Sequence, residues 1–393
     1  MTYTALVVGG GIAGTASAVA LRKAGMDAVV YEAYDRTADK AGAFLTLAPN
    51  ALDALRALDL DVGGLGFDTP GITITSGSGR RLGELAYRLG DVVSRTVKRA
   101  DLYRYLRDQD LHLEYGKRLT GAVATGDGVR ATFSDGSTAE GDLLIGADGL
   151  RSATRRIIDP AAPGTRYTGL LNTGGYARGV ATGSEPGMMQ AVFGKRCFFV
   201  YTAHPDGEVW WAANPAQATE LTPAEMAAIT QQEWRTRLSD LFRHDHGPAL
   251  DIIAATGEIF AGWSSYDVPR VPVWHRDRMI VIGDAAHATA PSIGQGAAMA
   301  IEDAVVLAKC LRDSPGIEAA FRAYEVLRRG RVERVVAQGN RTGGWKALNP
   351  LARVPRDLIM SLAMKHAART GTDPSRWIYE HRIDWDRPIA LPA

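Results

Sequence analysis

The pattern of apolar and polar positions begins with a strand, a helix and a second strand. Residues 5–8 form a short, continuously apolar run, which is typical of a parallel strand buried on both faces. Residues 12–24 place small apolar side chains at helical spacing, and Gly25 follows as a helix stop. A second apolar run covers residues 28–31. This order predicts a β-α-β unit at the start of an α/β fold.

The middle of the chain has a different pattern. Short strands are expected at residues 72–75 and 81–85, and residues 187–214 are rich in strand-forming side chains. One helix is predicted over residues 222–242, with Thr222 as its cap and Pro223 in its first turn. We expect an antiparallel sheet here, packed beside the α/β part.

The α/β pattern returns towards the C-terminus. The run "MIVIGD" at residues 279–284 predicts a buried strand, and helices are predicted at residues 296–311 and 317–339. A basic amphipathic segment at residues 351–370 and a tail that contains tryptophan follow. The sheet region therefore interrupts a nucleotide-binding domain that resumes after it.

Composition excludes several classes of partner. A chain of 393 residues is expected to form two or three domains. Its 45 basic and 44 acidic residues give a net charge of +1, which offers no electrostatic reason to expect nucleic acid or an anionic membrane as a partner. No apolar run approaches the roughly 18 residues of a membrane span, and no signal-peptide pattern precedes the first strand. We expect a cytoplasmic protein.

The chain contains two cysteines, Cys197 and Cys310, and each lies within an apolar segment. This placement predicts buried thiols in a reducing compartment, with a disulfide or a metal site as the alternative.

A glycine-rich motif joins the first strand to the first helix. Gly9 permits a tight turn, Gly11 lets the backbone approach a pyrophosphate, and Gly14 lets the helix pack closely on the strand. Glu32 ends the second strand about 20 residues later, where its carboxylate can accept hydrogen bonds from ribose hydroxyls. The motif predicts a dinucleotide site, but it does not separate NAD from FAD.

Two later stretches carry further site candidates. Asp148-Gly149 follows a predicted strand at its carboxyl end, where α/β sheets bind ligands, although this dipeptide is by itself an ordinary turn signal. Asp284 ends the strand at 279–284, and a carboxylate there can hold a sugar or ribitol hydroxyl. His287 is more simply interpreted as a structural loop histidine than as a catalyst.

Together these stretches resemble the single-component FAD-dependent aromatic hydroxylases, the p-hydroxybenzoate hydroxylase-like family. The matching motifs are G-x-G-x-x-G at residues 9–14, G-A-D-G-x-x-S-x-x-R at 146–155 and G-D-A-A-H-x-x-x-P-x-x-G-Q-G-A at 283–297. Residues 41–60 and 97–106 are also similar to family segments.

The resemblance implies a Rossmann-like FAD-binding domain with an inserted, mainly antiparallel β-sheet substrate domain and C-terminal helices. The FAD-binding domain is expected to comprise residues 1–70, 96–160 and 270–345. The substrate domain is expected to comprise residues 71–95 and 161–269, and residues 346–393 a bridging helix and tail.

The resemblance also implies roles for single residues. The glycines and Ala13 would hold the FAD pyrophosphate, Glu32 the adenosine ribose and Asp284 the ribitol. Thr46 would lie where a loop of the family approaches the flavin ring, residues 294–298 would line that ring, and Leu119 would contact the adenine through its backbone. Core packing is the alternative role for Thr46 and Leu119. The complete set of expected FAD contacts is Gly9, Gly11, Ala13, Gly14, Glu32, Thr46, Arg99, Leu119, Asp148, Asp284, Pro291, Gly294, Gln295, Gly296, Ala297 and Ala298.

The activity implied by the resemblance is that of a monooxygenase. It would use NADPH or NADH as a transient reductant and O2, through a C4a-hydroperoxyflavin, to hydroxylate or epoxidise an aromatic or polycyclic small molecule. No catalytic side chain is expected, because the cofactor carries the chemistry. No second G-x-G-x-x-G lies between a strand and a helix, so we expect no separate nicotinamide domain.

Two alternatives remain open on the same scaffold. One is an FAD-dependent oxidoreductase or halogenase, although "WSSYDVP" at residues 263–269 does not match the W-x-W-x-I-P segment of halogenases. The other is a flavin-binding protein without turnover. The oligomeric state is not predicted.

The substrate is expected between the flavin and the sheet. Arg196 resembles the arginine that binds anionic substrates in urate-hydroxylase-like members, with a solvated strand arginine as the alternative. For the aromatic candidates the alternative is packing within the sheet. The candidate substrate-binding residues are Arg196, Tyr201, Trp210 and Trp211, with Phe193 and Phe198 as further wall candidates.

Overall fold

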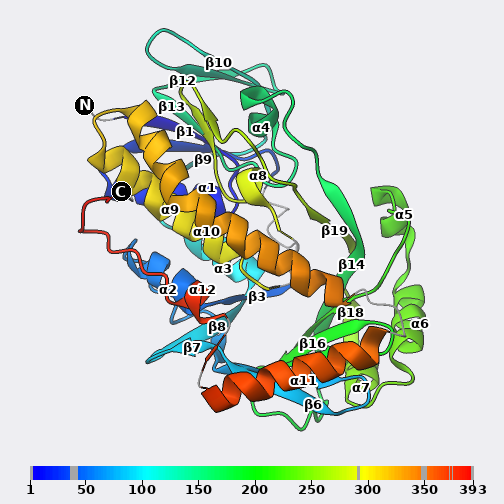
Figure 1. The fold of residues 1–393 in the computed structure, drawn as a ribbon. Coiled ribbons are helices and arrows are strands. Elements are labelled where there is room, and N and C mark those ends of the chain that lie inside the picture. Colours follow the sequence, from blue (N-terminus) through cyan, green and yellow to red (C-terminus); the bar gives the residue numbers. More distant parts are fainter. Residues whose placement is uncertain are drawn as a thin grey trace.

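The computed structural model describes residues 3–35, 43–289, 293–346, 352–370, 372–373 and 375–390. Figure 1 shows an α/β half, which contains both the first strands and the long helices α9 (Gly296–Asp313) and α10 (Ile317–Lys346). The other half is built around a large sheet, with α11 (Arg353–Thr370) lying across it. The described helices include none that is long and apolar enough to cross a membrane.

The α/β half is organised by a six-stranded sheet. Its central strand, β1 (Thr4–Val8), pairs in parallel with β2 (Asp27–Tyr31) on one side and with β13 (Leu143–Gly146) on the other. Its outer strands are β9 (His112–Glu114), β21 (Met279–Val281) and β20 (His275–Arg276), which give the order β20-β21-β13-β1-β2-β9. β13 and β21 come from distant parts of the chain, so the sheet brings the motifs at their carboxyl ends to one edge.

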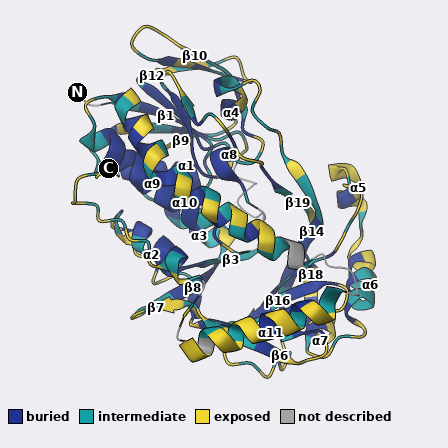
Figure 2. Cartoon of the chain, viewed as in Figure 1, coloured by how far each residue is buried: buried dark blue, intermediate teal, exposed yellow. Residues whose placement is uncertain are grey.

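Helix α1 (Ile12–Lys23) packs against α9. Ala16 and Ala20 in this helix are completely buried, and nearly every residue from 12 to 21 is inaccessible to solvent. Figure 2 shows the same burial along α1 and α9. Small side chains on α1 thus allow two helices and the sheet to pack closely, as the alanine pattern predicted.

The other half contains the antiparallel sheet predicted for the middle of the chain. In spatial order its strands are β18 (Thr256–Ile259), β14 (Arg166–Ala177), β17 (Val209–Asn214), β16 (Phe198–Ala203), β15 (Met189–Phe193), β5 (Gly71–Ser76) and β6 (Arg81–Ala86), with β19 (Trp263–Asp267) beside β14. All described pairings in this sheet are antiparallel except that of β5 with β15. Cys197 and Cys310 are free and buried, as expected.

Shorter elements complete the two halves. One small sheet consists of β3 (Phe44–Leu47), β8 (Val92–Lys98), β4 (Phe67–Thr69) and β7 (Arg88–Leu89), and another of β10 (Leu119–Ala124), β11 (Val129–Phe133) and β12 (Thr138–Gly141). The remaining short helices are α2 (Pro49–Arg56), α3 (Arg99–Arg107), α4 (Ala153–Ile158), α7 (Ala249–Ala255), α8 (Asp284–His287) and α12 (Arg376–Tyr379). Because β8 runs directly into α3, Arg99 lies where a strand turns into a helix.

Two helix predictions were wrong. Residues 222–242 form two helices, α5 (Pro223–Ala228) and α6 (Gln231–Phe242), because Thr230 starts a second capping box with Glu233. Helix α10 continues past Gly339, where a Cβ would lie 2.9 Å from Thr289 Oγ1. The glycine thus permits close packing on a loop and does not stop the helix.

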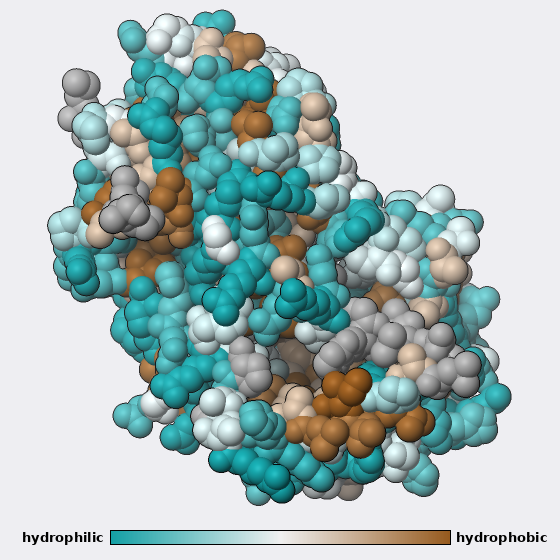
Figure 3. Space-filling model, in the orientation of Figure 1, coloured by the Kyte–Doolittle hydropathy of each residue, from teal (hydrophilic) through white to brown (hydrophobic). Residues whose placement is uncertain are grey.

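The C-terminal segment is fastened to the α/β half. Lys309 Nζ donates a hydrogen bond of 2.9 Å to the carbonyl of Trp385 and further bonds to those of Asp384 and Arg387. On α11, by contrast, an apolar stripe faces solvent, and Figure 3 shows it as a brown patch low on the molecule. The exposed side chains of this stripe are Val354, Leu358, Ile359 and Leu362.

Candidate functional site

The turn between β1 and α1 requires glycine for steric reasons at two positions. Gly9 has φ of +107°, and a Cβ there would lie 2.4 Å from the carbonyl oxygen of Ala147. A Cβ on Gly14 would lie 1.8 Å from the carbonyl oxygen of Gly9. Gly11 is different, because the nearest atom to its Cβ position is Tyr103 Oη at 3.7 Å. The absent side chain of Gly11 therefore leaves space for a ligand at the start of α1.

A cavity of about 530 Å³ opens beside this turn. Six residues predicted from the sequence line it, namely Gly9, Gly11, Glu32, Arg99, Leu119 and Asp148. They come from the turn after β1, the end of β2, the starts of α3 and β10, and the turn after β13. The sheet topology thus gathers side chains that are more than 100 positions apart in the sequence.

Glu32 lies at the end of β2 and points to the glycine turn. Its Oε2 accepts a hydrogen bond of 2.6 Å from Gly10 N, and its Oε1 accepts one of 2.9 Å from Tyr34 N. The carboxylate is therefore held in the wall of the cavity, where ribose hydroxyls can reach it.

Basic side chains that the sequence analysis missed surround the cavity. They are Arg107, Lys117, Arg118, Arg151 and Arg156, in addition to Arg99. Together with the partial positive charge at the start of α1, they favour an anionic ligand such as a diphosphate. The run Tyr115-Gly-Lys-Arg, which directly follows β9, was the available signal for two of them.

Asp148 has structural partners as well as a place in the cavity wall. It accepts hydrogen bonds from Thr154 N at 2.9 Å and Thr154 Oγ1 at 3.0 Å, and also from Ser152 Oγ. The neighbouring Arg155 is buried and donates a 2.8 Å bond to the carbonyl of Ala285. This bond connects the Asp148 turn to α8.

Asp284, the first residue of α8, is accessible to solvent and accepts no hydrogen bond from the described residues. Burial raises the pKa of its carboxyl group, and the charges of His287 and Arg99 offset this only in part. Burial alone would lower the pKa of Arg99, but Tyr103 and Asp284 raise it above its ordinary value. The side chain thus reaches the surface, although the surrounding protein disfavours its charged form. A carboxylate that accepts no hydrogen bond from the described residues is suited to accept hydrogen bonds from a ligand.

The α8 turn also contacts the glycine turn. Gly283 has φ of +58°, and a Cβ there would lie 3.0 Å from the Cβ of Ala13 in α1. The contact requires a small residue at each position. Ala13 therefore joins two of the motifs that the sequence analysis assigned to one site.

A second cavity, of about 280 Å³, lies beside the large sheet. Thr46, Gly294 and Gln295 line it together with apolar side chains of β5, β15 and β16. The apolar lining includes Ile72, Met189, Phe198 and Val200, and the polar lining includes Asn172, Asn214 and Lys346. Gly296, Ala297 and Ala298 form the first turn of α9 next to this loop, while Pro291 lies outside the described residues.

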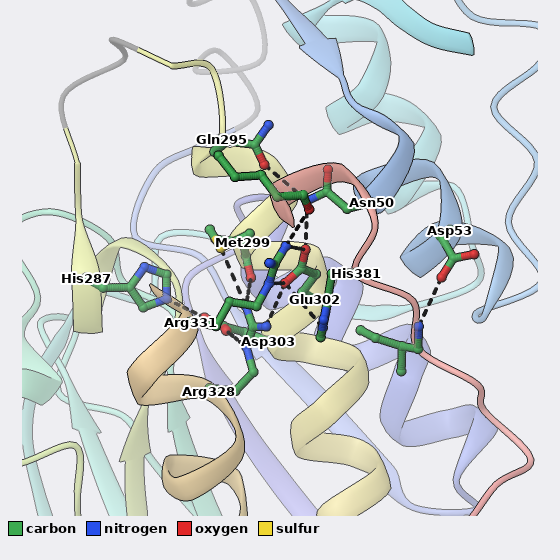
Figure 4. Close-up of polar contacts among 12 residues, drawn as sticks. Asn50, Asp53, His287, Gln295, Met299, Glu302, Asp303, Arg328, Arg331 and His381 are labelled. Carbon is green, nitrogen blue, oxygen red and sulfur yellow. Dashed lines mark hydrogen bonds and ion pairs between the residues drawn. The ribbon is translucent and has the colours of Figure 1, made fainter. Parts of the chain in front are cut away.

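A buried polar network connects α8 with the start of α9, at the two ends of the motif at residues 283–297, as Figure 4 shows. Asn50 Nδ2 donates to Gln295 Oε1 at 3.1 Å and to Glu302 Oε1 at 2.7 Å. Arg328 bridges Glu302 and Asp303, with distances of 2.6 Å and 2.7 Å. The network fixes the start of α9, on which the ring-binding glycines were predicted.

The comparisons agree with this geometry. A family model described as "FAD binding domain" matches residues 2–338. The chain is 31% identical to an FAD-dependent urate hydroxylase of Klebsiella pneumoniae subsp. pneumoniae, over 86% of this chain and 88% of the relative. The chain belongs to the family of FAD-dependent aromatic hydroxylases.

Other relatives of this flavoprotein support the same conclusion. Aurachin C monooxygenase/isomerase of Stigmatella aurantiaca is 31% identical, over 86% of this chain and 88% of the relative. The structure of Klebsiella pneumoniae HpxO complexed with FAD and uric acid superposes with a TM-score of 0.82 at 28% identity, over 94% of this chain and 95% of that one. The α/β fold with its large antiparallel sheet is thus the family fold, and the chain is an FAD-dependent monooxygenase.

The residues present fit FAD. Gly11 leaves an open cradle, basic side chains line the cavity, and Asp284 offers an acceptor to which no described residue donates a hydrogen bond. These features match a cofactor with a diphosphate and a chain of hydroxyl groups.

Most of the substrate-binding residues predicted for this flavoprotein lie outside the cavity beside the large sheet. Arg196 Nη1 pairs with Asp240 Oδ2 at 2.7 Å on the surface. Trp210 packs on Phe67 and His204, and Trp211 stacks on Phe199 with its indole nitrogen bonded to Thr256. Arg196, Tyr201, Trp210, Trp211 and Phe193 do not line the 280 Å³ cavity, whereas Phe198 does.

The polar residues of that cavity were missed. Asn172 and Asn214 lie within strands, in the stretches "LLNTGG" and "WWAANP". Asparagine is depleted in strands, so its presence there was a usable signal. No local pattern in the sequence indicated Lys346 as a site residue, because α10 was predicted to end at residue 339 and Lys346 lies beyond that point.

Proposed function

We propose that this monooxygenase uses NADH or NADPH and O2 to hydroxylate a planar aromatic small molecule in the cavity beside the large sheet. The observation that carries the proposal is the shared lining of that cavity. Thr46, Gly294 and Gln295, expected from the sequence to approach the flavin ring, line it together with Phe198 and other apolar side chains of the sheet. A planar apolar substrate would therefore meet the reactive part of the cofactor there.

The proposed FAD contacts follow from the position of each group. Gly9, Gly11, Ala13 and Gly14 would place the α1 N-terminus at the pyrophosphate, and Glu32 would accept ribose hydroxyls. Leu119 would contact the adenine, and Asp148 would complete the wall of the same cavity. Arg99 and Asp284 would contact the phosphate and ribitol of FAD. Residues 294–298 would contact its flavin ring.

When bound and reduced, FAD would supply the reaction with O2, so no side chain has to act as a nucleophile. The chain itself would perform three tasks. The free N–H groups at the start of α9, from Gly296 to Ala298, would stabilise negative charge on a neighbouring oxygen-rich ring. The apolar side chains of β15 and β16 would exclude water, and the cavity walls would orient the substrate.

We also propose a division of labour along the chain. Residues 1–70, 96–160 and 270–345 would hold FAD, and residues 71–95 and 161–269 would form the substrate side. The bonds from Lys309 to the segment around Trp385 support a bridging role for residues 346–393, because they tie this segment back to α9.

Purified enzyme with FAD provides the test. Oxidation of NADPH or NADH should accelerate when a suitable aromatic compound is added, and isotopically labelled O2 should place one labelled oxygen atom in the product. Reductant oxidation that yields only hydrogen peroxide with every compound of a broad phenol and heterocycle panel would contradict the proposal. It would favour an oxidase or a flavin-binding protein without oxygen transfer.

A further inference from the structure

Among the described residues that line the cavity beside the large sheet, Lys346 has the one charged side chain. Lys346, the last residue of α10, places its Nζ 2.9 Å from Asn214 Oδ1 and 4.1 Å from the centroid of the Phe198 ring. All three side chains line the cavity. The ammonium therefore lies over the aromatic floor of the proposed substrate site.

Among the described residues, no carboxylate lies within ion-pair distance of Lys346. The buried Arg328, by contrast, contacts two carboxylates. An ammonium group has three N–H donors, and Asn214 satisfies only one of them.

Burial lowers the pKa of Lys346 to about 8, which reflects this missing charge partner. The nearby Cys197 does not supply it, because burial raises the pKa of its thiol to about 12 and keeps it neutral. An anion entering the cavity would provide the compensation that the protein does not.

The amide side chains around Lys346 also favour a ligand that accepts hydrogen bonds. Asn214 Nδ2 donates to Asn172 Oδ1 at 2.8 Å, which turns Asn214 Oδ1 towards Lys346. The Nδ2 group of Asn172 has no acceptor among the described residues, and Asn172 lines the cavity. The unused polar groups at this wall include N–H donors of Lys346 and Asn172, and the buried hydroxyl of Ser94, which has no hydrogen-bond partner among the described residues. All three can donate a hydrogen bond to an acceptor.

We propose that Lys346 is the specificity-determining residue of the substrate site and binds an acidic group, a carboxylate or an ionised ring hydroxyl, of an aromatic substrate. This proposal rests on the proposed function, since it assigns the substrate class of the same site. Asn172 would donate a second hydrogen bond to the same acidic group, and Phe198 would pack against the ring. Neutral aromatic compounds of the same shape would leave the ammonium group of Lys346 without a charged partner.

Binding to the FAD-loaded enzyme can be measured by calorimetry, which requires no turnover. The probes are hydroxybenzoates and hydroxynaphthoates with their neutral amides, and phenols with their methyl ethers. The acid–amide pairs report on a carboxylate, and the phenol–ether pairs report on a ring oxygen. The variants are Lys346→Met, Lys346→Arg and, as a matched control on the exposed face of α11, Lys365→Met.

At least one acidic probe should bind the natural enzyme about tenfold to a hundredfold more tightly than its neutral counterpart. Lys346→Met should abolish this preference and leave FAD content and the binding of neutral probes unchanged. Lys346→Arg should retain the preference in part, and Lys365→Met should retain it fully.

The proposal is overturned if no acidic probe binds the natural enzyme more tightly than its neutral counterpart, or if Lys346→Met keeps the preference. Failure of the proposed function has a different signature. In that case Lys346 would still govern the binding of acidic probes, but none of the bound probes would acquire oxygen from O2.

Discussion

His287 Nε2 and Asp303 Oδ2 lie 2.6 Å apart in a buried pair. The same Asp303 oxygen accepts a hydrogen bond of 2.9 Å from Gly283 N, which immediately precedes Asp284. Burial disfavours the Asp303 carboxylate, but the charges of His287 and Arg328 outweigh burial and hold its pKa well below the ordinary value. His287 is therefore a structural residue that holds the α8 turn on α9, as the sequence analysis preferred.

Replacing Asp303 with Asn should destabilise the protein strongly. The change leaves Arg328 and His287 with one carboxylate fewer in a buried network, and such losses cost about 3–5 kcal/mol. Urea unfolding measures the change in the free energy of unfolding. Glu318→Gln is the matched control, because its pair with Arg322 is exposed and should contribute less than about 1 kcal/mol. Equal effects of both changes would contradict the structural role of the network.

Two alanine substitutions in the glycine turn should affect different properties, one the affinity for FAD and the other the stability of the fold. Gly11→Ala meets no protein atom closer than 3.7 Å, so the protein should fold with a loss of no more than about 1 kcal/mol. Its FAD affinity should nevertheless fall at least about tenfold, because the new methyl group occupies the space at the start of α1.

Gly14→Ala should act on folding instead. Its Cβ would lie 1.8 Å from a backbone oxygen, so helix and strand must separate at a cost of roughly 1–3 kcal/mol or more. Thermal unfolding without FAD and fluorescence titration with FAD distinguish the two effects. If the Gly11→Ala variant bound FAD with unchanged affinity, this turn would not be the binding site of the cofactor.

Asp284 should make FAD binding dependent on pH. Its pKa is raised, so in the FAD-free protein it takes up a proton at a higher pH than an ordinary aspartate does. A protonated carboxyl group is a weaker acceptor for ribitol hydroxyls, and FAD affinity should therefore decrease as the pH falls through this range. Asp284→Asn should bind FAD more weakly, by roughly 1–3 kcal/mol, and should lose this part of the pH dependence. Titrations over a pH series would contradict the assignment if both proteins gave the same profile.

His381 should contribute to acid sensitivity of the fold. Burial lowers its pKa from 6.5 to about 4, although Glu302 partly opposes this shift. Between these values the unfolded chain binds a proton that the folded chain does not, so the free energy of unfolding should decrease as the pH falls from 6.5 towards 4. His381→Gln should flatten this slope, whereas His366→Gln on the exposed face of α11 should not. Equal slopes for the two variants would contradict the prediction.

The cofactor side of the molecule could be predicted because its signals are local. The apolar run of β1, the glycine turn and the alanine face of α1 fall within about 20 consecutive residues, and each constrains the others. The motifs near Asp148 and Asp284 follow buried strands, and parallel pairing brings the ends of such strands to one edge of the sheet. The spacing of the glycines and Glu32 did not distinguish NAD from FAD. The resemblance of the later motifs to the family then identified FAD.

The substrate side could not be predicted in the same way. Side chains alternate between the faces of a strand, and the sequence does not say which face of the large sheet borders the cavity. Phe198 and Val200 face it, whereas Tyr201 and Trp211 lie on the opposite face. Trp210 shares the face of Ala212 and Asn214 but packs on Phe67 and His204 outside the cavity. Lys346 meets Asn214 across 132 positions, so their contact depends on how far α10 extends. Gly339 predicted an earlier end to that helix, but the helix continues to Lys346 with Gly339 packed against the loop at Thr289.

The central claim is that the cavity at the glycine turn holds FAD for oxygen transfer. The most direct test is the visible absorption spectrum of the purified protein, recorded before and after addition of FAD and followed by release of the flavin on denaturation. The account predicts a yellow protein that retains one FAD per chain after gel filtration, with Gly11→Ala largely colourless but folded. A folded natural protein that stays colourless and takes up no added FAD would contradict it.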